Sequence, residues 1–231
     1  AIDKLIDILD LRLPADLCQR YELLENVPES ERPVVFIDPY EHHSNELPWR
    51  ESIADVISIP LTQCGRIDLE ILDQKLQACA QRSLLIGSFS VASNVTGIKS
   101  DVAGVSAILK SHGALIFWDY AAAAPYMAID MNGATAFDAV FISPHKFIGG
   151  PGTPGVLVAK SKILSNSVPA VVGGGTVSYV TPHDHAYLAD HERREEGGTP
   201  AIVESIRAGL VFKLQSEVGT GEIERLEASF G

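Results

Sequence analysis

The sequence is poor in cysteine, in aromatic residues and in positive charge. Its 231 residues include three Cys, 7% aromatic residues, and 18 Lys and Arg against 30 Asp and Glu, for a formal net charge of −12. The cysteines, Cys18, Cys64 and Cys79, are an odd number at irregular spacing, which favours reduced intracellular thiols over a disulfide framework or a zinc knuckle. The negative charge opposes a phosphate backbone, so nucleic acid is not an expected partner.

Long apolar runs and biased segments are also missing. No stretch approaches the roughly 20 apolar residues that a membrane-spanning helix needs. The start, Ala1 to Lys4, has no cationic region followed by an apolar run, as a signal peptide has. With 19 Gly and 13 Pro, the composition is neither collagen-like nor of low complexity. We therefore expect a globular, intracellular protein of the cytoplasm, with one large domain or two small ones and no membrane partner.

Short apolar runs rich in β-branched residues alternate with helical patterns along the chain. Apolar spacing predicts helices over residues 68–76, from 102 to about 112, and from 200 to about 218. Residues 165–199 are expected to be rich in loops. The alternation predicts an α/β domain with a mainly parallel sheet flanked by helices. The expected strands are residues 34–37, 55–59, 83–89, 114–118, 139–142 and 156–158.

Polar residues follow four of these strands, where parallel sheets bind their ligands. They are residues 41–45, the pair Ser93 and Asn94, Asp119, and residues 143–146. Together these segments supply a carboxylate, an amine, imidazoles, hydroxyls and an amide. Pyridoxal phosphate requires this combination: a lysine for a Schiff base, an acid partner for the pyridinium nitrogen, and donors for the phosphate and the phenolic oxygen.

The segments that carry these residues resemble the class V aminotransferases of the cysteine desulfurase and selenocysteine lyase type. The resemblance implies a pyridoxal-5'-phosphate-dependent transferase or lyase of fold type I. It also implies an amino-acid substrate and a homodimer. The matching segments occur in family order and are residues 41–49 (EHHSNELPW), 93–97 (SNVTG), 118–122 (WDYAA), 143–151 (SPHKFIGGP) and 196–200 (EGGTP).

The resemblance implies a role for each matching side chain. Lys146 forms the Schiff base, Asp119 keeps the pyridine nitrogen protonated, and His42 stacks on the ring; these three are the expected catalytic residues. Because His42 and His43 are adjacent, on an extended segment they point to opposite sides and only one faces the cofactor. The expected cofactor-binding set is His42, Asn94, Asp119, Ala121, Ser143, His145, Lys146 and Thr199, with Thr199 reaching the phosphate of the partner subunit.

Several departures from the family pattern limit what the resemblance implies. Ala122 stands where cysteine desulfurases usually carry Gln, and no cysteine matches the family's persulfide loop. The turn that seats the phosphate and the C-terminal small domain have no counterpart. We therefore expect residues 1–231 to be a large domain truncated at both ends, which binds the cofactor weakly or not at all. The reaction stays open between desulfuration, transamination, elimination and epimerisation.

Two other interpretations remain. His183, His185 and His191, with Asp184 and Glu192 beside them, could bind a metal, since His-x-His spacing supplies two ligands from one strand. A zinc-dependent hydrolase would use such a cluster, although we assign no metal ligand. The second alternative is a cofactor-free scaffold or interaction fragment.

Overall fold

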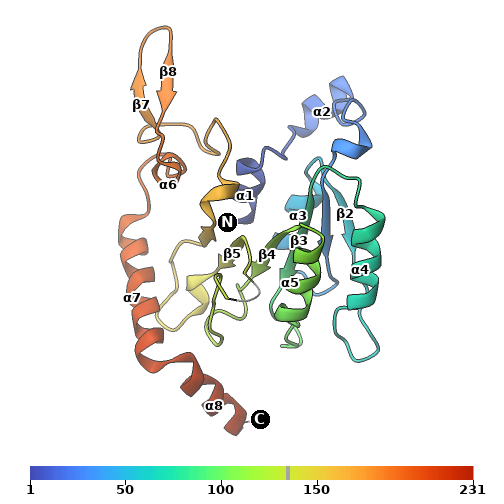
Figure 1. The fold of residues 1–231 in the computed structure, drawn as a ribbon. Coiled ribbons are helices and arrows are strands. Elements are labelled where there is room, and N and C mark those ends of the chain that lie inside the picture. Colours follow the sequence, from blue (N-terminus) through green and yellow to red (C-terminus); the bar gives the residue numbers. More distant parts are fainter. Residues whose placement is uncertain (134–135, 231) are drawn as a thin grey trace.

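A six-stranded sheet lies at the centre of the part of the chain that the structure describes, residues 1–133 and 136–230 of a computed structural model (Figure 1). The strand order is β2-β1-β3-β4-β5-β6. Neighbouring strands are parallel except for β6, which runs antiparallel to β5. The strands are β1 Val34–Ile37, β2 Asp55–Ser58, β3 Leu85–Ser90, β4 Leu115–Asp119, β5 Ala139–Ile142 and β6 Val156–Ala159. The predicted α/β class with a mainly parallel sheet is confirmed.

Helices cover both faces of this sheet. Side chains alternate along β1, so that Val34 and Phe36 pack with α4 and α5, whereas Val35 and Ile37 pack with α1 and α3. None of the helices in the described residues combines the length and the apolar content of a membrane span. The helices are α1 Ile2–Ile8, α2 Ala15–Tyr21, α3 His43–Arg50, α4 Leu69–Ala78, α5 Val102–Ser111, α6 His191–Arg194, α7 Ile202–Val218 and α8 Thr220–Phe230, with 3-10 turns at Glu29–Glu31, Pro144–Lys146 and Ser161–Ile163.

The crossover helices α4 and α5 begin where the sequence predicts, and α4 ends at Ala78, just beyond its predicted end at residue 76. The Asp68 side chain accepts hydrogen bonds from the first backbone N–H groups of α4, and Asp101 accepts one from the N–H of Gly104 in α5 at 2.9 Å. Just after α5, Gly113 has φ of 69°, the left-handed conformation that glycine adopts without strain. These signals return the chain to β4 and set Asp119 at the C-terminal end of that strand.

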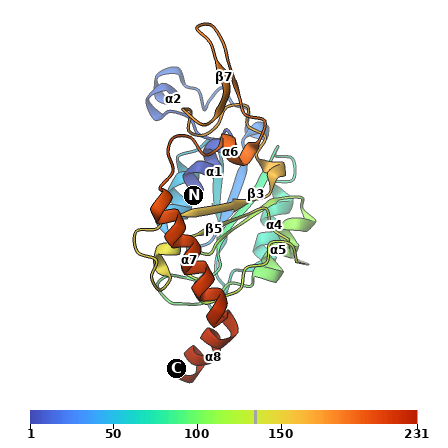
Figure 2. The ribbon, with the colours of Figure 1, turned by 90° about the vertical axis from the view of Figure 1, so that its left-hand side faces the viewer.

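The region between residues 165 and 199 is more ordered than the sequence predicts. It contains an antiparallel hairpin, β7 Val177–Val180 and β8 His185–Tyr187, followed by α6. The Thr181 hydroxyl closes the hairpin turn by accepting a hydrogen bond from the N–H of Asp184 at 2.9 Å. Figures 1 and 2 both show this hairpin projecting from one end of the molecule, with α8 extending from the other.

Candidate functional site

A small cavity lies at the C-terminal edge of the parallel strands. It is lined by residues from the segments that follow β1, β3, β4 and β5, because the carboxyl ends of parallel strands meet at one edge. Five predicted site residues share this lining with Ser90, Ala92 and Ala122. These five are His42, Asn94, Asp119, Ala121 and Lys146.

Asp119 is the buried carboxyl group of this cavity. Its side chain is 7% exposed, and its Oδ1 accepts a hydrogen bond from the N–H of Ala121 at 2.7 Å. Burial raises the pKa of Asp119, while the Ala121 N–H and the charges of Lys146 and His42 act to lower it. A cation placed against this carboxyl group would oppose the effect of burial and lower the pKa of Asp119, because a nearby opposite charge favours the ionised form.

His42 caps the helix that follows it, which differs from the extended segment expected at this point. His43 is the first residue of α3, and the two imidazole centroids are 5.9 Å apart with a tilt of 38°. The Nδ1 of His42 accepts a hydrogen bond from the N–H of Ser44 at 3.2 Å. A neutral His42 ring therefore carries its proton on Nε2. His42 lines the cavity and His43 does not.

Lys146 ends the short 3-10 turn Pro144–Lys146 between β5 and β6. The turn is closed by the N–H of Lys146, which donates to the carbonyl oxygen of Ser143 at 3.0 Å, and by the N–H of Phe147, which donates to that of Pro144 at 3.0 Å. The Phe147 ring packs edge-on against Phe212 of α7 at 5.4 Å. The amine of Lys146 is thus carried on a fixed backbone, although the side chain itself is exposed.

The remaining predicted site residues lie outside this lining. Ser143 and His145 flank Lys146 on its turn, the first half-buried and the second exposed, and neither lines the cavity. Thr199 is exposed in the loop between α6 and α7 and does not line it either. The cavity lining therefore contains the residues predicted to contact the cofactor ring, but not those predicted to bind its phosphate.

A buried polar network adjoins the cavity through Ser90, and none of its members was predicted as a site residue. Glu41 accepts hydrogen bonds from Ser90 and Asn45, and Asn45 in turn accepts one from the Ser88 hydroxyl at 2.7 Å. The Trp49 indole N–H also donates to the Ser88 hydroxyl, at 3.1 Å. A sequence signal was available, since Ser88 and Ser90 are two residues apart in an apolar strand and so share one face.

Asp38, at the end of β1, adds a second buried carboxyl group beside this network. One of its oxygens accepts a hydrogen bond from the N–H of Tyr40 at 2.6 Å, and the other has no partner among the described residues. Burial raises the pKa of Asp38 from 3.8 to about 6, against the opposing effect of the Tyr40 N–H. Burial, and then the charge of Asp38, likewise raise the pKa of Glu41 well above its ordinary value.

These raised pKa values predict a loss of stability as the pH rises. Between about pH 4 and pH 6 the folded state holds protons that the unfolded state has released, so the free energy of unfolding falls with pH. The shift of Asp38 alone corresponds to about 3 kcal/mol. In denaturant titrations at pH 4 and pH 7, Asp38→Asn is expected to gain about that much stability relative to the unaltered chain at the higher pH. The exposed Glu51→Gln serves as the control, and parallel pH curves for Asp38→Asn and the unaltered chain would contradict the assignment.

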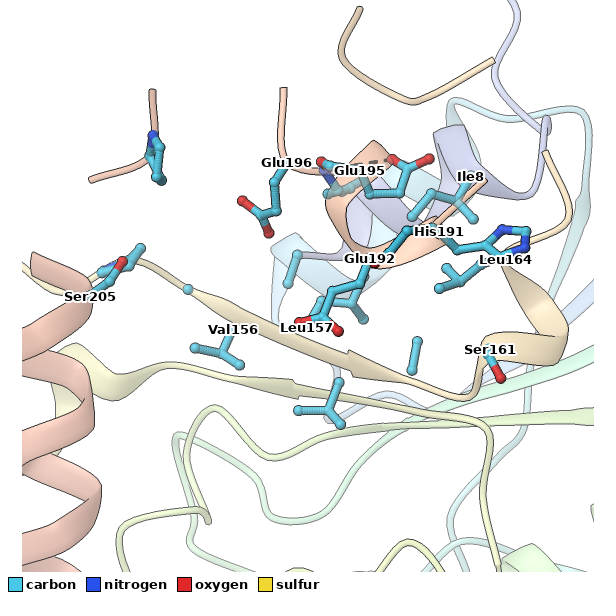
Figure 3. Close-up of a pocket in the computed structure, with 18 of the residues that line it drawn as sticks. Ile8, Val156, Leu157, Ser161, Leu164, His191, Glu192, Glu195, Glu196 and Ser205 are labelled. Carbon is cyan, nitrogen blue, oxygen red and sulfur yellow. Dashed lines mark hydrogen bonds and ion pairs between the residues drawn. The ribbon is translucent and has the colours of Figure 1, made fainter. Parts of the chain in front are cut away.

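A larger pocket, of about 910 Å³, lies elsewhere (Figure 3). Val156 and Leu157 of the edge strand β6 line one side, and Glu192 and Glu195 of the α6 region line another. The Lys4 amine donates a hydrogen bond to the carbonyl oxygen of Glu195 and lies 3.6 Å from its carboxylate. None of the predicted cofactor-binding residues lines this pocket.

The alternative of a metal site gains no support from these positions. His183 lies in the exposed hairpin turn, His185 begins β8, and His191 begins α6 at the larger pocket. Within residues 1–133 and 136–230, no group of three or more His, Cys, Asp or Glu side chains is placed to hold a metal ion. The His-x-His pair of this alternative therefore lies on a hairpin arm without a third ligand among the described residues.

Known proteins resemble this chain over most of its length. The sequence profile of the family described as Aminotransferase class-V matches residues 23–230. A probable cysteine desulfurase of Halalkalibacterium halodurans is 31% identical over 197 residues, which are 84% of this chain and 47% of that protein. One of Staphylococcus epidermidis is 34% identical over 202 residues, 86% of this chain and 47% of that protein. The chain thus spans about half the length of these relatives.

Solved structures give the same result. The cysteine desulfurase CsdA of Escherichia coli superposes with a TM-score of 0.73 at 25% identity, over 84% of this chain and 48% of that one. The apo cysteine desulfurase of Thermococcus onnurineus gives 0.75 at 25% identity, over 96% of this chain and 52% of that one. The likeness therefore covers most of this chain in three dimensions as well as in sequence.

Proposed function

The chain belongs to the class V aminotransferase family, and from this premise we propose that it forms the pyridoxal-5'-phosphate-binding part of an enzyme that acts on an amino acid. One observation carries the proposal: an amine, a buried carboxyl group, an imidazole and an amide from four separate segments line a single cavity at the C-terminal edge of the sheet. The arrangement accounts for Asp119 and Lys146 together, which neither a scaffold nor a metal site explains.

The donor set fits this cofactor in its chemistry. Asp119 would face the pyridine nitrogen, His42 would lie against the ring, and Asn94 would donate to the phenolic oxygen. His42, Asn94 and Lys146 are exposed, and the cavity encloses only about 10 Å³, so a ring would lie over these residues and not in a closed chamber. Ser143 and His145, on the same turn as Lys146, are the proposed phosphate donors.

When bound, pyridoxal phosphate supplies an aldehyde carbon that amines attack and a ring that withdraws electrons from the attached atoms. In the proposed mechanism, Lys146 would hold the cofactor through its amine and would give up that place to the amine of an amino-acid substrate. The freed amine then takes a proton from the substrate Cα and returns it. Asp119 would favour the protonated, cationic form of the ring nitrogen, and its buried position would keep water from screening the pair.

The substrate class follows from the relatives more than from the cavity. The names of the relatives make cysteine the first amino acid to test. None of Cys18, Cys64 and Cys79 lines the cavity, so a sulfur-accepting thiol would come from outside the described residues. Ala122 in the lining offers no second side-chain donor to the phenolic oxygen beside Asn94, which keeps transamination, elimination and epimerisation open.

A homodimer is the proposed assembly. The long helix α7 exposes a row of apolar side chains, which in a lone domain would face water: Ile202, Val203, Ile206, Leu210 and Leu214. Thr199, just before this helix, lies away from the lining of its own cavity, as a residue that serves the partner subunit would. Light scattering on the purified chain measures the assembly directly.

The proposed function is tested by locating the cofactor on the chain. The purified chain is mixed with pyridoxal 5'-phosphate, treated with borohydride to fix any lysine adduct, and digested for peptide mass spectrometry. An adduct confined to Lys146 supports the proposal. Random labelling of exposed lysines would favour the cofactor-free scaffold, and so would no labelling at a cofactor concentration high enough to detect weak binding. A parallel incubation with Zn²⁺ and a chelator tests the metal alternative on the same sample.

A further inference from the structure

The carboxyl group of Glu41 is the centre of the buried network that adjoins the cavity. Both of its oxygens are occupied: Oε1 accepts from the backbone N–H of Ser90 at 2.7 Å, and Oε2 accepts from the Ser90 hydroxyl at 2.8 Å and from the Asn45 amide at 2.6 Å. Glu41 is 9% exposed and Asn45 is fully buried. Three donors point at this buried carboxyl group, so Glu41 is part of the folded interior and not a solvated surface residue.

This one side chain ties together the segments that form two walls of the cavity. Glu41 directly precedes His42, so fixing Glu41 also fixes the backbone that carries the His42 ring. Ser90 ends β3 and itself lines the cavity. Asn45 lies in α3, whose first turn orients the His42 imidazole through Ser44. The bonds from Glu41 span 49 residues of sequence to Ser90 and four to Asn45.

We propose that Glu41 is a positioning residue of the site: by joining the start of α3 to the end of β3, it holds the His42 imidazole against the Ser90 wall at the spacing that a flat aromatic ring requires. This inference rests on the proposed function. Glu41 does not line the cavity and so acts only through His42 and Ser90. A carboxyl group suits this task because it presents acceptors to a backbone N–H, a hydroxyl and an amide at once.

The experiment replaces one acceptor oxygen of Glu41 with a donor while keeping the size of the side chain. Glu41→Gln retains an acceptor for the Ser90 N–H but sets its own amide donor against that of Asn45. Adding Asn45→Asp restores a donor-acceptor pair between the two side chains. Asp138→Asn is the matched control, because Asp138 is also a buried carboxyl group that accepts from a strand N–H, that of Ile116 at 2.9 Å. It precedes β5 at the opposite edge of the sheet.

The first measurement needs no cofactor. In ¹⁵N spectra of the imidazoles, taken where they are neutral, the unaltered chain is expected to show His42 as a single tautomer protonated on Nε2. In Glu41→Gln the two His42 nitrogen shifts are expected to move toward each other, as tautomers average in a released ring. The double variant is expected to restore them, and Asp138→Asn to leave them unchanged. His42 shifts that are the same in Glu41→Gln and in Asp138→Asn would overturn the inference.

The second measurement uses pyridoxal 5'-phosphate, followed by its absorbance and its induced circular dichroism. Glu41→Gln is expected to weaken binding about tenfold, the order associated with the loss of one buried hydrogen bond. Its induced dichroism is expected to fall further than that of Asp138→Asn at equal occupancy. If the unaltered chain binds no cofactor, the proposed function fails for this chain, while the imidazole spectra still decide the role of Glu41. If it binds and Glu41→Gln matches Asp138→Asn, the positioning role fails alone.

Discussion

Lys146→Ala is expected to abolish the covalent attachment of pyridoxal 5'-phosphate at the cavity. Of the residues that line the cavity in the described structure, Lys146 alone carries an amine, so no other side chain there can hold the cofactor's aldehyde carbon. The shift in visible absorbance that follows mixing of the unaltered chain with the cofactor is therefore expected to be absent in the variant. Because Lys146 is exposed and makes no side-chain hydrogen bond in the described residues, its loss is expected to leave stability within about 0.5 kcal/mol.

The control for this result is a lysine close in sequence and away from the cavity. Lys160 follows β6 and does not line the cavity, so Lys160→Ala is expected to keep the absorbance shift in full. Absorbance titration and mass spectrometry of the borohydride-treated samples measure both variants. A shift retained by Lys146→Ala, or lost equally in both variants, would contradict the assignment of Lys146.

The parts of the fold that could be predicted are those whose signals are local. Asp68, Asp101 and Gly113 mark helix ends through contacts within three residues of themselves, and β4 is a continuous apolar run. Because strands that alternate with helices form a parallel sheet, Asp119 at the end of β4 must lie at the C-terminal edge of that sheet. The turn between β5 and β6 places Lys146 at the same edge by the same reasoning.

Other features depend on partners distant in sequence. The helix α3 contains Pro48 and is capped by His42, which is not among the favoured capping residues. The sequence at the start of α3 therefore looks like that of an extended segment. The burial of Glu41 depends on Ser90, 49 residues away. The hairpin of β7 and β8 is short, follows three glycines and has Pro182 in its turn, a composition typical of loops. Local propensity gives no information about such contacts.

Gly150 has no charge and lies outside the cavity lining, yet its replacement is expected to have the second largest effect on the site. A Cβ at this position would lie 1.9 Å from the carbonyl oxygen of Pro144 and 3.0 Å from that of Phe147. Both atoms belong to the backbone of the turn that carries Lys146, so the turn itself must move. Phe147 resists that movement through its packing against Phe212. Gly150→Ala is expected to lower the free energy of unfolding by about 2 kcal/mol, within the range for overpacked interiors.

The displaced turn also moves the Lys146 amine away from Asp119 and His42. The yield of the Lys146 adduct is therefore expected to fall at least about tenfold, since such reactions depend on ångström-scale placement of the amine. Gly155→Ala is the matched control in the same loop, because the nearest atom to its Cβ would be 3.9 Å away, an ordinary contact. That variant is expected to keep stability within about 0.5 kcal/mol and the full adduct yield. Equal stability and yield in the two variants, by denaturant titration and mass spectrometry, would mean that Lys146 is not held in place by the close packing of Gly150 against the turn.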